Sequence, residues 1–387
     1  MAQIYFDNSA TTKMSARARE KMLLVIEANY GNPSSLHTLG LDGERVLTEA
    51  RNIIATTLGI SRLTRGEIIF TSGGTESNNI AILGSVFAKK RRGNEKILTT
   101  EGEHASVEEP LKYLESLGYN IVRVPTRGGK IDLDFLRQNS KDAILASFMH
   151  VNNETGALYD LKEAFKIVKE NASGAILHAD CVQSYMKVKF SPKSIGADLI
   201  SISSHKINGA KGVGALYISP ELLRAKKISP LFLGGGQEES LRSGTENVYG
   251  IASFGEAAKE HFEVLDKEIE IMSSLREYIV SELGSINGVR VNAPERCAPH
   301  IINITVNGIR SETLLHFLSS KEIYVSSGSA CSSNSQKKQS RALAGFGLDK
   351  NALDSSVRIS LCPQNTRQEA DKLKEAISEA CARLARR

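Results

Sequence analysis

The stretch AILHADCVQSYMKVKFSPKSIGADLISISSHKINGAKG, residues 175–212, decides the fold. It contains two short and almost continuously apolar runs, AILHAD (175–180) and LISIS (199–203), each followed by polar residues. Such runs are typical of strands that are buried on both faces of a parallel sheet. Ligands of open α/β sheets bind at the carboxyl ends of these strands. The polar residues after each run are therefore candidates for a functional site.

The same pattern continues on both sides of this stretch. Further strand-like runs are EIIF (67–70), KILTT (96–100), NIVRV (120–124), AILASF (143–148) and GALYI (214–218). The segments between them resemble helices, for example ESNNIAILGSVFAKK (76–90) and ASVEEPLKYLESLG (105–118). This alternation predicts an α/β fold with a mostly parallel central sheet flanked by helices.

The pattern changes near residue 256. The segment 256–285 has apolar residues three and four positions apart, which predicts a long amphipathic helix that bridges two domains. A strand-like run at 300–306 and a final helix at 367–386 follow it. We therefore predict a large domain and a smaller α+β domain. The large domain covers residues 14–257, and the small domain is formed by residues 1–13 and 258–387.

The composition is that of an ordinary globular protein. The 387 residues are 41% hydrophobic and 24% charged, with a formal net charge of +5. This charge is too small to indicate nucleic-acid binding, and no basic block is interleaved with aromatic residues. The N-terminus has no long apolar region, and no segment approaches the ~18 apolar residues of a membrane span. By elimination we expect a cytoplasmic protein with no membrane or direct nucleic-acid partner.

Five cysteines occur in the sequence. This odd, sparse set contains no CxxC pair, which argues against both a disulfide framework and a zinc site. Some cysteines are expected to be buried and inert while one is reactive, and composition alone does not identify it. The five are Cys181, Cys297, Cys331, Cys362 and Cys381.

Lys206 lies in SSHKINGAKG (203–212), directly after the predicted strand 199–203. A lysine held in a crevice at the end of a strand can form a Schiff base with an aldehyde cofactor. Taken alone, Lys206 is better explained as a surface lysine. Its companions at the ends of other strands reverse that interpretation.

Two of these companions suit an anionic aromatic cofactor. TSGGTESNN (71–79) is a glycine-rich turn before a helix, and a helix N-terminus binds phosphate, although Thr75 and Glu76 also fit ordinary capping. Asp180, in HADCVQS (178–184), is a carboxylate that can keep a pyridine nitrogen protonated, or it caps the next segment. Gln183 either donates to a ring hydroxyl or faces solvent.

Two further strand ends carry candidate ligands. His104, in TEGEHAS (100–106), suits stacking on a ring or proton transfer, although a lone histidine is more often structural. Asn153, in FMHVNNETG (148–156), follows a strand and can hydrogen-bond a ligand, whereas we interpret His150 as structural.

Cys331 and Arg358 complete the candidate set. Cys331 lies in VSSGSACSSNSQ (325–336), which has almost no apolar anchor and is predicted to be mobile. An arm of ten residues reaches roughly 30 Å when extended, so its thiol can visit a buried substrate and then the surface. Arg358 alternates with apolar residues in SSVRISL (355–361), and its planar guanidinium suits a substrate carboxylate unless it is a surface residue.

Taken together and in this order, these segments closely resemble the NifS/IscS-type cysteine desulfurases, members of the class V aminotransferase-like, fold type I pyridoxal-phosphate (PLP) family. The resemblance covers the chain nearly end to end. Its matching runs are FDNSATT (6–12), YGNPSS (30–35), TSGGTES (71–77), EHAS (103–106), HVNNETG (150–156), HADCVQ (178–183), SSHKINGAKG (203–212), RSGTENV (242–248) and SSGSACSS (326–333).

The resemblance implies a role for each matching residue. Lys206 would be the lysine that binds the cofactor and the base at the substrate Cα, His104 would stack on the ring and help to move protons, and Cys331 would accept the sulfur. Asp180 would pair with the ring nitrogen, and Arg358 would bind the substrate carboxylate. Asn153 and Gln183 would lie near the ring hydroxyl, and Gly74, Thr75, Ser203 and His205 would hold the phosphate.

The resemblance also implies partners. Thr245 matches a residue that family members lend to the phosphate of the other subunit, which implies a homodimer. Twenty-seven positions separate Cys331 from Arg358, as in the long-loop group, whose members hand sulfur to a scaffold protein. The expected acceptor is an iron–sulfur scaffold or a tRNA-thiolation enzyme. No metal site is expected, apart from an iron–sulfur contact at Cys331 during transfer.

The sequence departs from the family at four positions near the site. Asn208 and Ala210 stand where Tyr and Pro are common, and Cys181 and Ser9 replace small residues, often Ala. None of these changes removes a catalytic group. They leave the geometry around Lys206 open, and Cys181 is a second thiol that is a candidate for modification.

The implied reaction removes sulfur from L-cysteine to give L-alanine and a Cys331 persulfide, which an acceptor thiol then takes up. One rival is another fold type I reaction, such as transamination or a selenocysteine-specific lyase. An aminotransferase has no need of a cysteine in a mobile loop. The other rival is a sulfur-carrier subunit that has lost its cofactor, against which Lys206 and Asp180 argue.

Overall fold

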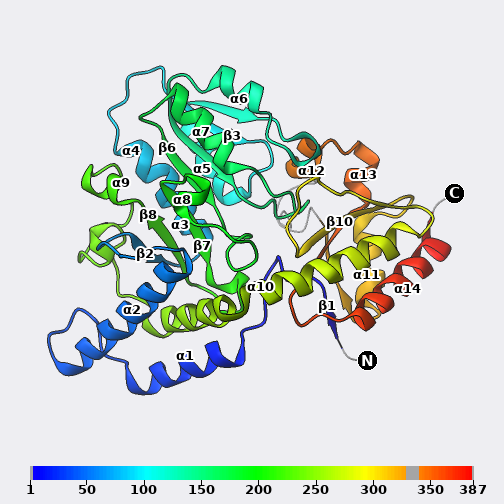
Figure 1. Cartoon of the computed structure of the whole chain (residues 1–387), viewed down its shortest axis with the longest axis horizontal. Coiled ribbons are helices and arrows are strands. Elements are labelled where there is room, and N and C mark those ends of the chain that lie inside the picture. The colour runs from blue at the N-terminus through cyan, green and yellow to red at the C-terminus, as the bar shows by residue number, and fades with distance from the viewer. Residues whose placement is uncertain (1–2, 328–339, 386–387) are drawn as a thin grey trace.

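The protein is described by a computed structural model, which covers residues 3–327 and 340–385. A seven-stranded sheet forms the larger part (Figure 1), with the strand order β2-β8-β7-β6-β5-β3-β4. Only β8 runs antiparallel to its neighbours, so the predicted mostly parallel sheet is confirmed. The strands are β2 (Ile68–Thr71), β3 (Lys96–Thr100), β4 (Asn120–Val124), β5 (Ala143–Met149), β6 (Ile176–Asp180), β7 (Leu199–Ser203) and β8 (Gly214–Ile218).

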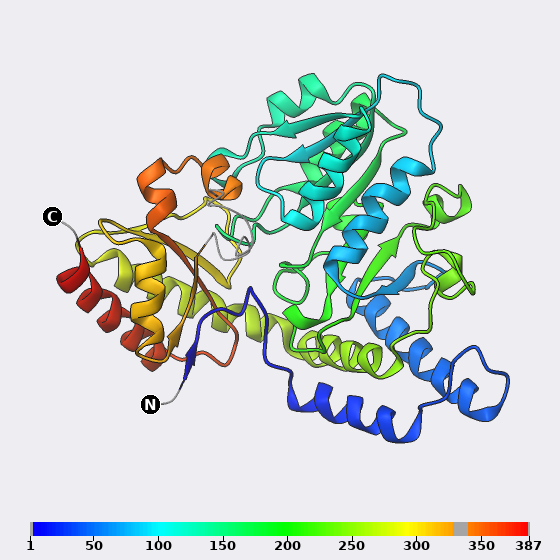
Figure 2. The ribbon, with the colours of Figure 1, turned by 180° about the vertical axis from the view of Figure 1, so that it is seen from behind.

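Helices cover both faces of this sheet, as the views from the front and from behind show (Figures 1 and 2). Side chains alternate along each strand, so each face supplies its own hydrophobic core. One core includes residues of α1 (Ala16–Ala28), α2 (Thr38–Thr57), α7 (Leu161–Asn171) and the start of α10 (Val248–Gly284). The other includes residues of α5 (Ala105–Ser116) and α9 (Pro220–Arg224).

The predicted helix at 76–90 is interrupted. It consists of α3 (Gly74–Asn79), a π-helical turn (Ile80–Gly84) and α4 (Ser85–Phe87). Three apolar residues of the π-helical turn, Ile80, Ala81 and Ile82, are fully buried against the sheet. The remaining helices over this sheet are α6 (Leu133–Asn139) and α8 (Pro192–Ile195).

A second, smaller body contains a four-stranded antiparallel sheet with the order β12-β13-β10-β9. A short parallel pair, β1 with β11, lies beside it, and the two sheets share one hydrophobic core. The strands are β1 (Ile4–Tyr5), β9 (Val289–Val291), β10 (Ile301–Val306), β11 (Ile323–Tyr324), β12 (Ser326–Ser327) and β13 (Ser356–Ser360). The helices are α11 (Ser311–Ser319), α12 (Arg341–Phe346), α13 (Lys350–Ser355) and α14 (Arg367–Leu384).

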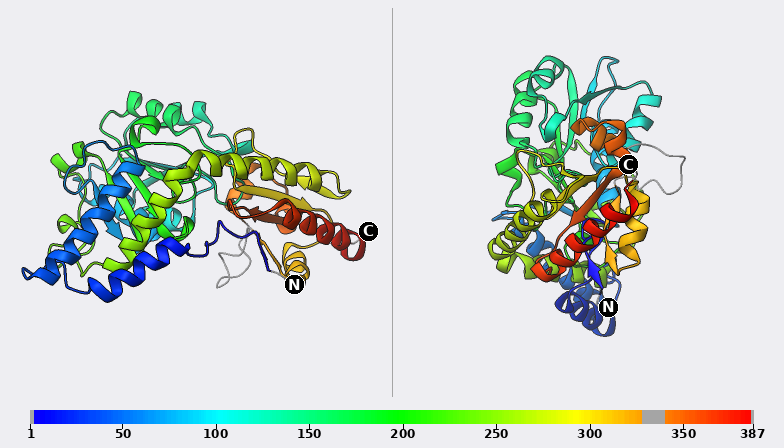
Figure 3. Two further views of the ribbon diagram at one scale, coloured as in Figure 1. Left: turned by 60° about the horizontal axis from the view of Figure 1, so that its bottom comes forward. Right: turned by 90° about the vertical axis from the view of Figure 1, so that its right-hand side faces the viewer.

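Helix α10 connects the two bodies (Figure 3). Its first half contributes Ile251 and Phe254 to the core of the large sheet, and its last turns contribute Ile279 and Leu283 to the small core. It begins eight residues before the predicted helix at 256–285, because apolar packing outweighs its two early glycines. Gly255 is needed for this packing, since a Cβ there would lie 3.0 Å from the Cα of Ala50 in α2.

The predicted domain boundary at 257/258 lies inside α10, and the helix departs from helical geometry only later, at Val264. The N-terminal residues Ile4 and Phe6 pack in the core of the small body. The division into 14–257 and 1–13 with 258–387 therefore stays a prediction. None of the helices in the two described ranges is both long and apolar enough to cross a lipid bilayer.

Candidate active site

A cavity of about 270 Å³ lies at the carboxyl ends of the strands of the large sheet. Nine residues that the sequence singled out line it: Gly74, Thr75, His104, Asn153, Asp180, Gln183, Ser203, His205 and Lys206. The strand order explains this, because β3, β5, β6 and β7 are neighbours and run in the same direction. Residues that follow these strands consequently meet at one edge of the sheet.

A larger hollow of about 630 Å³ lies elsewhere, between the end of α2, residues 185–190 and the irregular part of α10. It is open to solvent and is lined by apolar side chains such as Phe190 and Phe262, together with the Lys189–Asp266 ion pair. It contains none of the predicted site residues. The smaller cavity, with converging polar groups, is therefore the candidate site.

Lys206 ends the 3₁₀ turn Ser204–Lys206 that follows β7. Its Nζ donates to the carbonyl oxygens of Ser9 at 2.6 Å and Ala10 at 2.8 Å. The N-terminal segment thus forms one wall of the cavity beside the lysine. His205 turns its Nδ1 toward the Oγ1 of Thr11 at 3.1 Å, and burial together with nearby lysines lowers the pKa of His205 to about 4. Its imidazole is therefore neutral at pH 7.

Asp180 ends β6 and is held by two donors. The Nδ2 of Asn78 donates to its Oδ2 at 2.8 Å, and the amide of Val182 donates to its Oδ1 at 3.0 Å. The second bond is the local capping contact that the sequence also allowed. Asn78 was not predicted, although it lies within the quoted run TSGGTESNN. It is fully buried in α3, and also donates to the Oγ of Ser106 at 2.8 Å.

Several buried polar atoms at this cavity have no hydrogen-bond partner among the described residues. The Oγ of Ser203 and the Oε1 of Gln183 belong to residues that line the cavity, and the Oδ1 of Asn78 belongs to the residue that donates to Asp180. Gln183 uses its other amide atom to donate to the carbonyl of Ser9 at 2.9 Å. Buried polar groups are normally paired, so such atoms at a cavity indicate a polar ligand.

His104 precedes α5 and caps it, since its Nδ1 accepts from the amide of Ser106 at 3.2 Å. His104 therefore has the structural role of a helix cap and also lines the cavity, and its catalytic role stays a prediction. Burial lowers the pKa of His104, and Lys206 and Arg358 act in the same direction while Asp180 opposes them. The ring is thus neutral at pH 7.

Two carboxyl groups of partly buried residues lie close to the cavity. Glu103 accepts from the Oγ of Thr100 at 2.6 Å and the amide of Met149 at 2.9 Å, and burial raises its pKa to about 8. Glu154 follows Asn153 and accepts from the hydroxyl of Ser340 at 2.6 Å, and burial raises its pKa to about 7. Both carboxyl groups were missed by sequence analysis, which does not reveal burial of acidic residues in loops.

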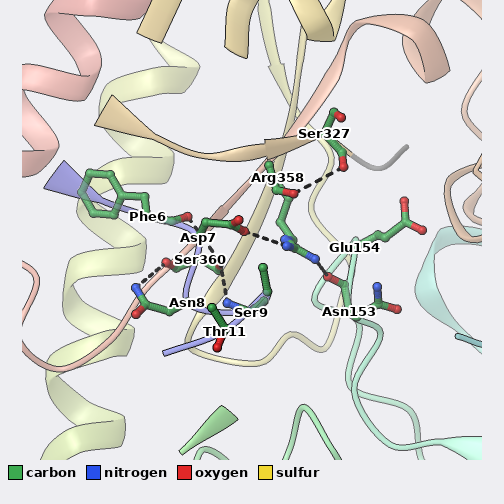
Figure 4. Close-up of polar contacts among 12 residues, drawn as sticks. Phe6, Asp7, Asn8, Ser9, Thr11, Asn153, Glu154, Ser327, Arg358 and Ser360 are labelled. Carbon is green, nitrogen blue, oxygen red and sulfur yellow. Dashed lines mark hydrogen bonds and ion pairs between the residues drawn. The ribbon is translucent and has the colours of Figure 1, made fainter. Parts of the chain in front are cut away.

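Arg358 lies in the middle of β13 and is 6% exposed. It does not line the cavity itself. Its Nη1 donates to the carbonyl of Asn153 at 2.8 Å, and its Nη2 donates to the Oδ1 of Asp7 at 2.8 Å (Figure 4). Since Asn153 does line the cavity, Arg358 stands directly behind its wall.

The remaining predicted residues do not line the cavity, or they lie outside the residues that the structure describes. Thr245 is exposed in the segment before α10 and does not line the cavity. Cys331 lies outside the described residues. Cys181 is fully buried, and burial raises the pKa of its thiol, so it lacks the accessibility of a reactive cysteine.

The departures after Lys206 have a structural explanation. Asn208 has a φ of 63°, a left-handed conformation that asparagine adopts more readily than most residues. Its Nδ2 donates to the carbonyl of Lys13 at 2.7 Å, and its Oδ1 lies 3.0 Å from the Nε2 of His261 in α10. Ala210 is buried. The loop after Lys206 is therefore tied to both the N-terminal segment and α10.

Comparison with known proteins agrees with this geometry. The model of the family described as "Aminotransferase class-V" matches residues 4–373. The chain belongs to this family. Within it, the predicted resemblance to the NifS/IscS-type cysteine desulfurases is confirmed. A protein named "Cysteine desulfurase IscS" from Dictyoglomus turgidum is 38% identical over 386 residues, which cover 99% of this chain and 95% of that protein.

Solved structures show the same likeness. A structure described as "NIFS-LIKE PROTEIN" has a TM-score of 0.90 and 34% identity, and covers 98% of this chain and 100% of its own. Another, described as "SspA in complex with cysteine", has a TM-score of 0.80 and 29% identity, and covers 94% of this chain and 100% of its own. The α/β class V fold is therefore established for the full length of the chain.

Proposed function

We propose that this protein is a cysteine desulfurase that uses PLP to take sulfur from L-cysteine and pass it on as a persulfide of Cys331. The observation that carries the proposal is the placement of Lys206 and Asp180 in one cavity, at the ends of adjacent strands. The full-length similarity to proteins named cysteine desulfurase supports the same conclusion.

The residues of the cavity fit PLP. Lys206 would hold its aldehyde, and the Asp180 carboxylate, which Asn78 and the amide of Val182 fix in place, would pair with its ring nitrogen. When bound, the cofactor supplies an electron sink that makes the substrate Cα–H acidic. The oxygens of Ser203 and Gln183 that find no partner in the described part of the chain suit its phosphate and ring hydroxyl.

Further residues complete this proposed cofactor site. Gly74 and Thr75 begin α3 at one wall of the cavity, where backbone and hydroxyl donors suit a phosphate. His205 is neutral at pH 7, so it can donate one ring hydrogen to the phosphate. Asn153 lines the cavity and would lie near the ring hydroxyl.

The chain's own residues would bind the substrate and move its protons. Arg358 would bind the α-carboxylate of L-cysteine from behind the wall that Asn153 forms. Once the substrate amine has replaced Lys206 on the cofactor, the free amine of Lys206 would take the Cα proton. His104 is neutral at pH 7, so its ring can stack on the cofactor and pass a proton without carrying a charge. The similar structure described as a complex with cysteine supports this substrate.

Cys331 would then receive the sulfur. Its thiolate attacks the substrate sulfur, the carbon–sulfur bond breaks with its electron pair returning to the carbon skeleton, and a proton completes L-alanine. Cys331 keeps the sulfur as a persulfide, and thiol exchange passes it to an acceptor protein. We propose an iron–sulfur scaffold or a tRNA-thiolation enzyme as the acceptor, since 27 positions separate Cys331 from Arg358 as in the long-loop group.

A second copy of the chain is proposed to complete the site. Thr245 is exposed and lies away from its own cavity, which suits a residue that serves the phosphate site of a partner. Large apolar side chains are exposed on α1 and after it, including Leu24, Tyr30 and Leu36. Light scattering tests whether the protein is a dimer. The PLP affinity of a Thr245→Ala variant tests whether Thr245 contributes to the phosphate site of the partner subunit.

The proposed activity is tested with the PLP-loaded protein and L-cysteine, by measuring L-alanine and total sulfide under reducing conditions. The parent is expected to release both in equal amounts, and Lys206→Ala to release neither. Cys331→Ala is expected to release neither above background. If Cys331→Ala works at the parent rate, the protein carries out another PLP reaction, and if the parent takes up no PLP, it is not an enzyme of this class.

A further inference from the structure

The N-terminal segment Phe6–Ala10 connects the two charged side chains on which the proposed function depends. Its carbonyls at Ser9 and Ala10 accept from the Nζ of Lys206. Its carboxylate at Asp7 accepts from the Nη2 of Arg358 at 2.8 Å. Figure 4 shows Asp7 and Arg358 turned toward each other, with Asn153 on the far side of the guanidinium.

Backbone groups and the side chains of neighbouring residues hold this segment without help from the Asp7 side chain. The amide of Ser360 donates to the carbonyl of Phe6 at 2.6 Å, and the amide of Ser9 donates to the Oγ of Ser360 at 2.9 Å. The Nδ2 of Asn8 donates to the carbonyl of Ser360 at 3.0 Å, and the ring of Phe6 is fully buried. The Asp7 carboxylate is therefore not required as an anchor for the segment.

The register between the N-terminal segment and β13 explains why Asp7 faces Arg358. Residues two apart on a strand point to the same face, so Arg358 and Ser360 share one face of β13. A parallel bridge places Asp7 opposite Ser360. The Asp7 carboxylate consequently contacts the guanidinium of Arg358, to which we assign the substrate carboxylate.

The guanidinium keeps donors for a second anion. Arginine has five N–H groups, of which one on Nη1 serves Asn153 and one on Nη2 serves Asp7. The Nε of Arg358 is buried and has no hydrogen-bond partner among the described residues. A carboxylate that binds Arg358 while Asp7 remains in place would meet a cation that already has an anionic partner.

We propose that Asp7 is a positioning residue that also sets substrate affinity. It holds Arg358 against the carbonyl of Asn153 in the cavity wall and, by its negative charge, weakens the attraction of this guanidinium for the carboxylate of the amino-acid ligand. This inference rests on the proposed function, because it assumes that Arg358 binds that carboxylate. It predicts that Asp7 tunes the dissociation constant without touching the ligand.

Asp7→Asn separates the charge from the position. An asparagine keeps an oxygen where Oδ1 accepts from Arg358, but it removes the negative charge. Removing one of two anions at the same guanidinium is expected to strengthen binding of the other by roughly tenfold. The probe is L-alanine, which has the amine and the carboxylate but no sulfur to transfer. The readout is the absorbance change of the PLP-loaded protein during titration, and turnover is not measured.

The controls isolate the carboxylate and the charge. Cysteamine, an amine and thiol without a carboxylate, is expected to bind Asp7→Asn and the parent equally. Asp160→Asn changes another Arg–Asp ion pair, with Arg296, which does not line the cavity, and is expected to leave L-alanine binding unchanged. Asp7→Glu keeps the charge and is expected to retain the weak affinity of the parent, and it serves as the second variant if Asp7→Asn folds poorly.

The outcomes separate the inference from the proposed function. If Arg358→Gln weakens L-alanine binding while Asp7→Asn leaves it unchanged or weaker, Asp7 has no effect through charge and the inference is overturned, while the proposed function stands. A tighter Asp7→Glu variant also overturns it. If Arg358→Gln leaves L-alanine binding unchanged, the carboxylate binds elsewhere. The proposed role of Arg358 and the inference about Asp7 are then both wrong.

Discussion

The Nδ2 of Asn78 lies 2.8 Å from the Oδ2 of Asp180, and both side chains are buried. Asn78 therefore fixes the carboxylate that we assign to the cofactor ring. We predict that Asn78→Ala lowers PLP affinity roughly tenfold or more, because a hydrogen bond to a charged group contributes about 1.5–3 kcal/mol. Titration of the unloaded protein with PLP measures this change. Asn79→Ala is the matched control, since within the described residues the Asn79 side chain bonds only to the carbonyl of Thr75 in the same helix.

An unchanged PLP affinity in Asn78→Ala would show that Asp180 needs no second donor beyond the amide of Val182. A loss of equal size in Asn79→Ala would attribute the effect to the helix and not to the carboxylate.

The parallel sheet and its site were largely predictable from the sequence, whereas Asn78 was not. Strand runs such as KILTT (96–100) and LISIS (199–203) have the predicted bounds, because continuous apolar runs between polar turns have few alternatives. Polar residues after these strands converge because parallel strands end at one edge. Local patterns therefore identified Lys206 and Asp180.

The rest depended on contacts between distant segments. Asp7 meets Arg358 across 351 positions of sequence, and no local pattern predicts such a pair. The π-helical turn after α3 and the early start of α10 are consequences of tertiary packing, which overrides helix propensity. Burial of Glu103 and Glu154 likewise depends on the whole fold.

Arg358→Lys is expected to raise the KM for L-cysteine roughly tenfold or more while kcat changes less. Lysine keeps the charge but loses the planar fork that donates to Asn153 and Asp7. Steady-state kinetics with L-cysteine measures both constants. A fall in kcat with an unchanged KM would place Arg358 in the chemical step instead of carboxylate binding.

His104 is expected to make the activity sensitive to acid. Burial lowers the pKa of His104 below the ordinary 6.5, so the ring stays neutral until the pH falls below that value. As the ring then gains a proton, the enzyme is expected to lose activity. We predict that the acidic limb of kcat/KM lies below pH 6.5 and that His104→Gln removes it. A pH profile of both proteins measures this limb. An acidic limb above pH 6.5 that persists in His104→Gln would assign it to another group.

Glu103 is expected to make stability depend on pH. Its pKa is raised from 4.5 to about 8 in the folded state, so the folded protein holds a proton that the unfolded chain has lost between these values. The free energy of unfolding therefore falls as the pH rises from about 4.5 to 8. Glu103→Gln is predicted to flatten this fall, which denaturant unfolding of the PLP-free protein at several pH values measures. Equal slopes for the two proteins would contradict the burial of an uncharged carboxyl group.

The central claim is that sulfur leaves L-cysteine and stays on Cys331. The direct measurement is peptide mass spectrometry of the PLP-loaded protein after brief exposure to L-cysteine without reductant. Cys181→Ala is the control for the thiol that follows Asp180 in the sequence. We predict one additional sulfur atom on the peptide that contains Cys331, in the parent and in Cys181→Ala alike, together with released L-alanine. Release of L-alanine with no sulfur on that peptide would contradict the account.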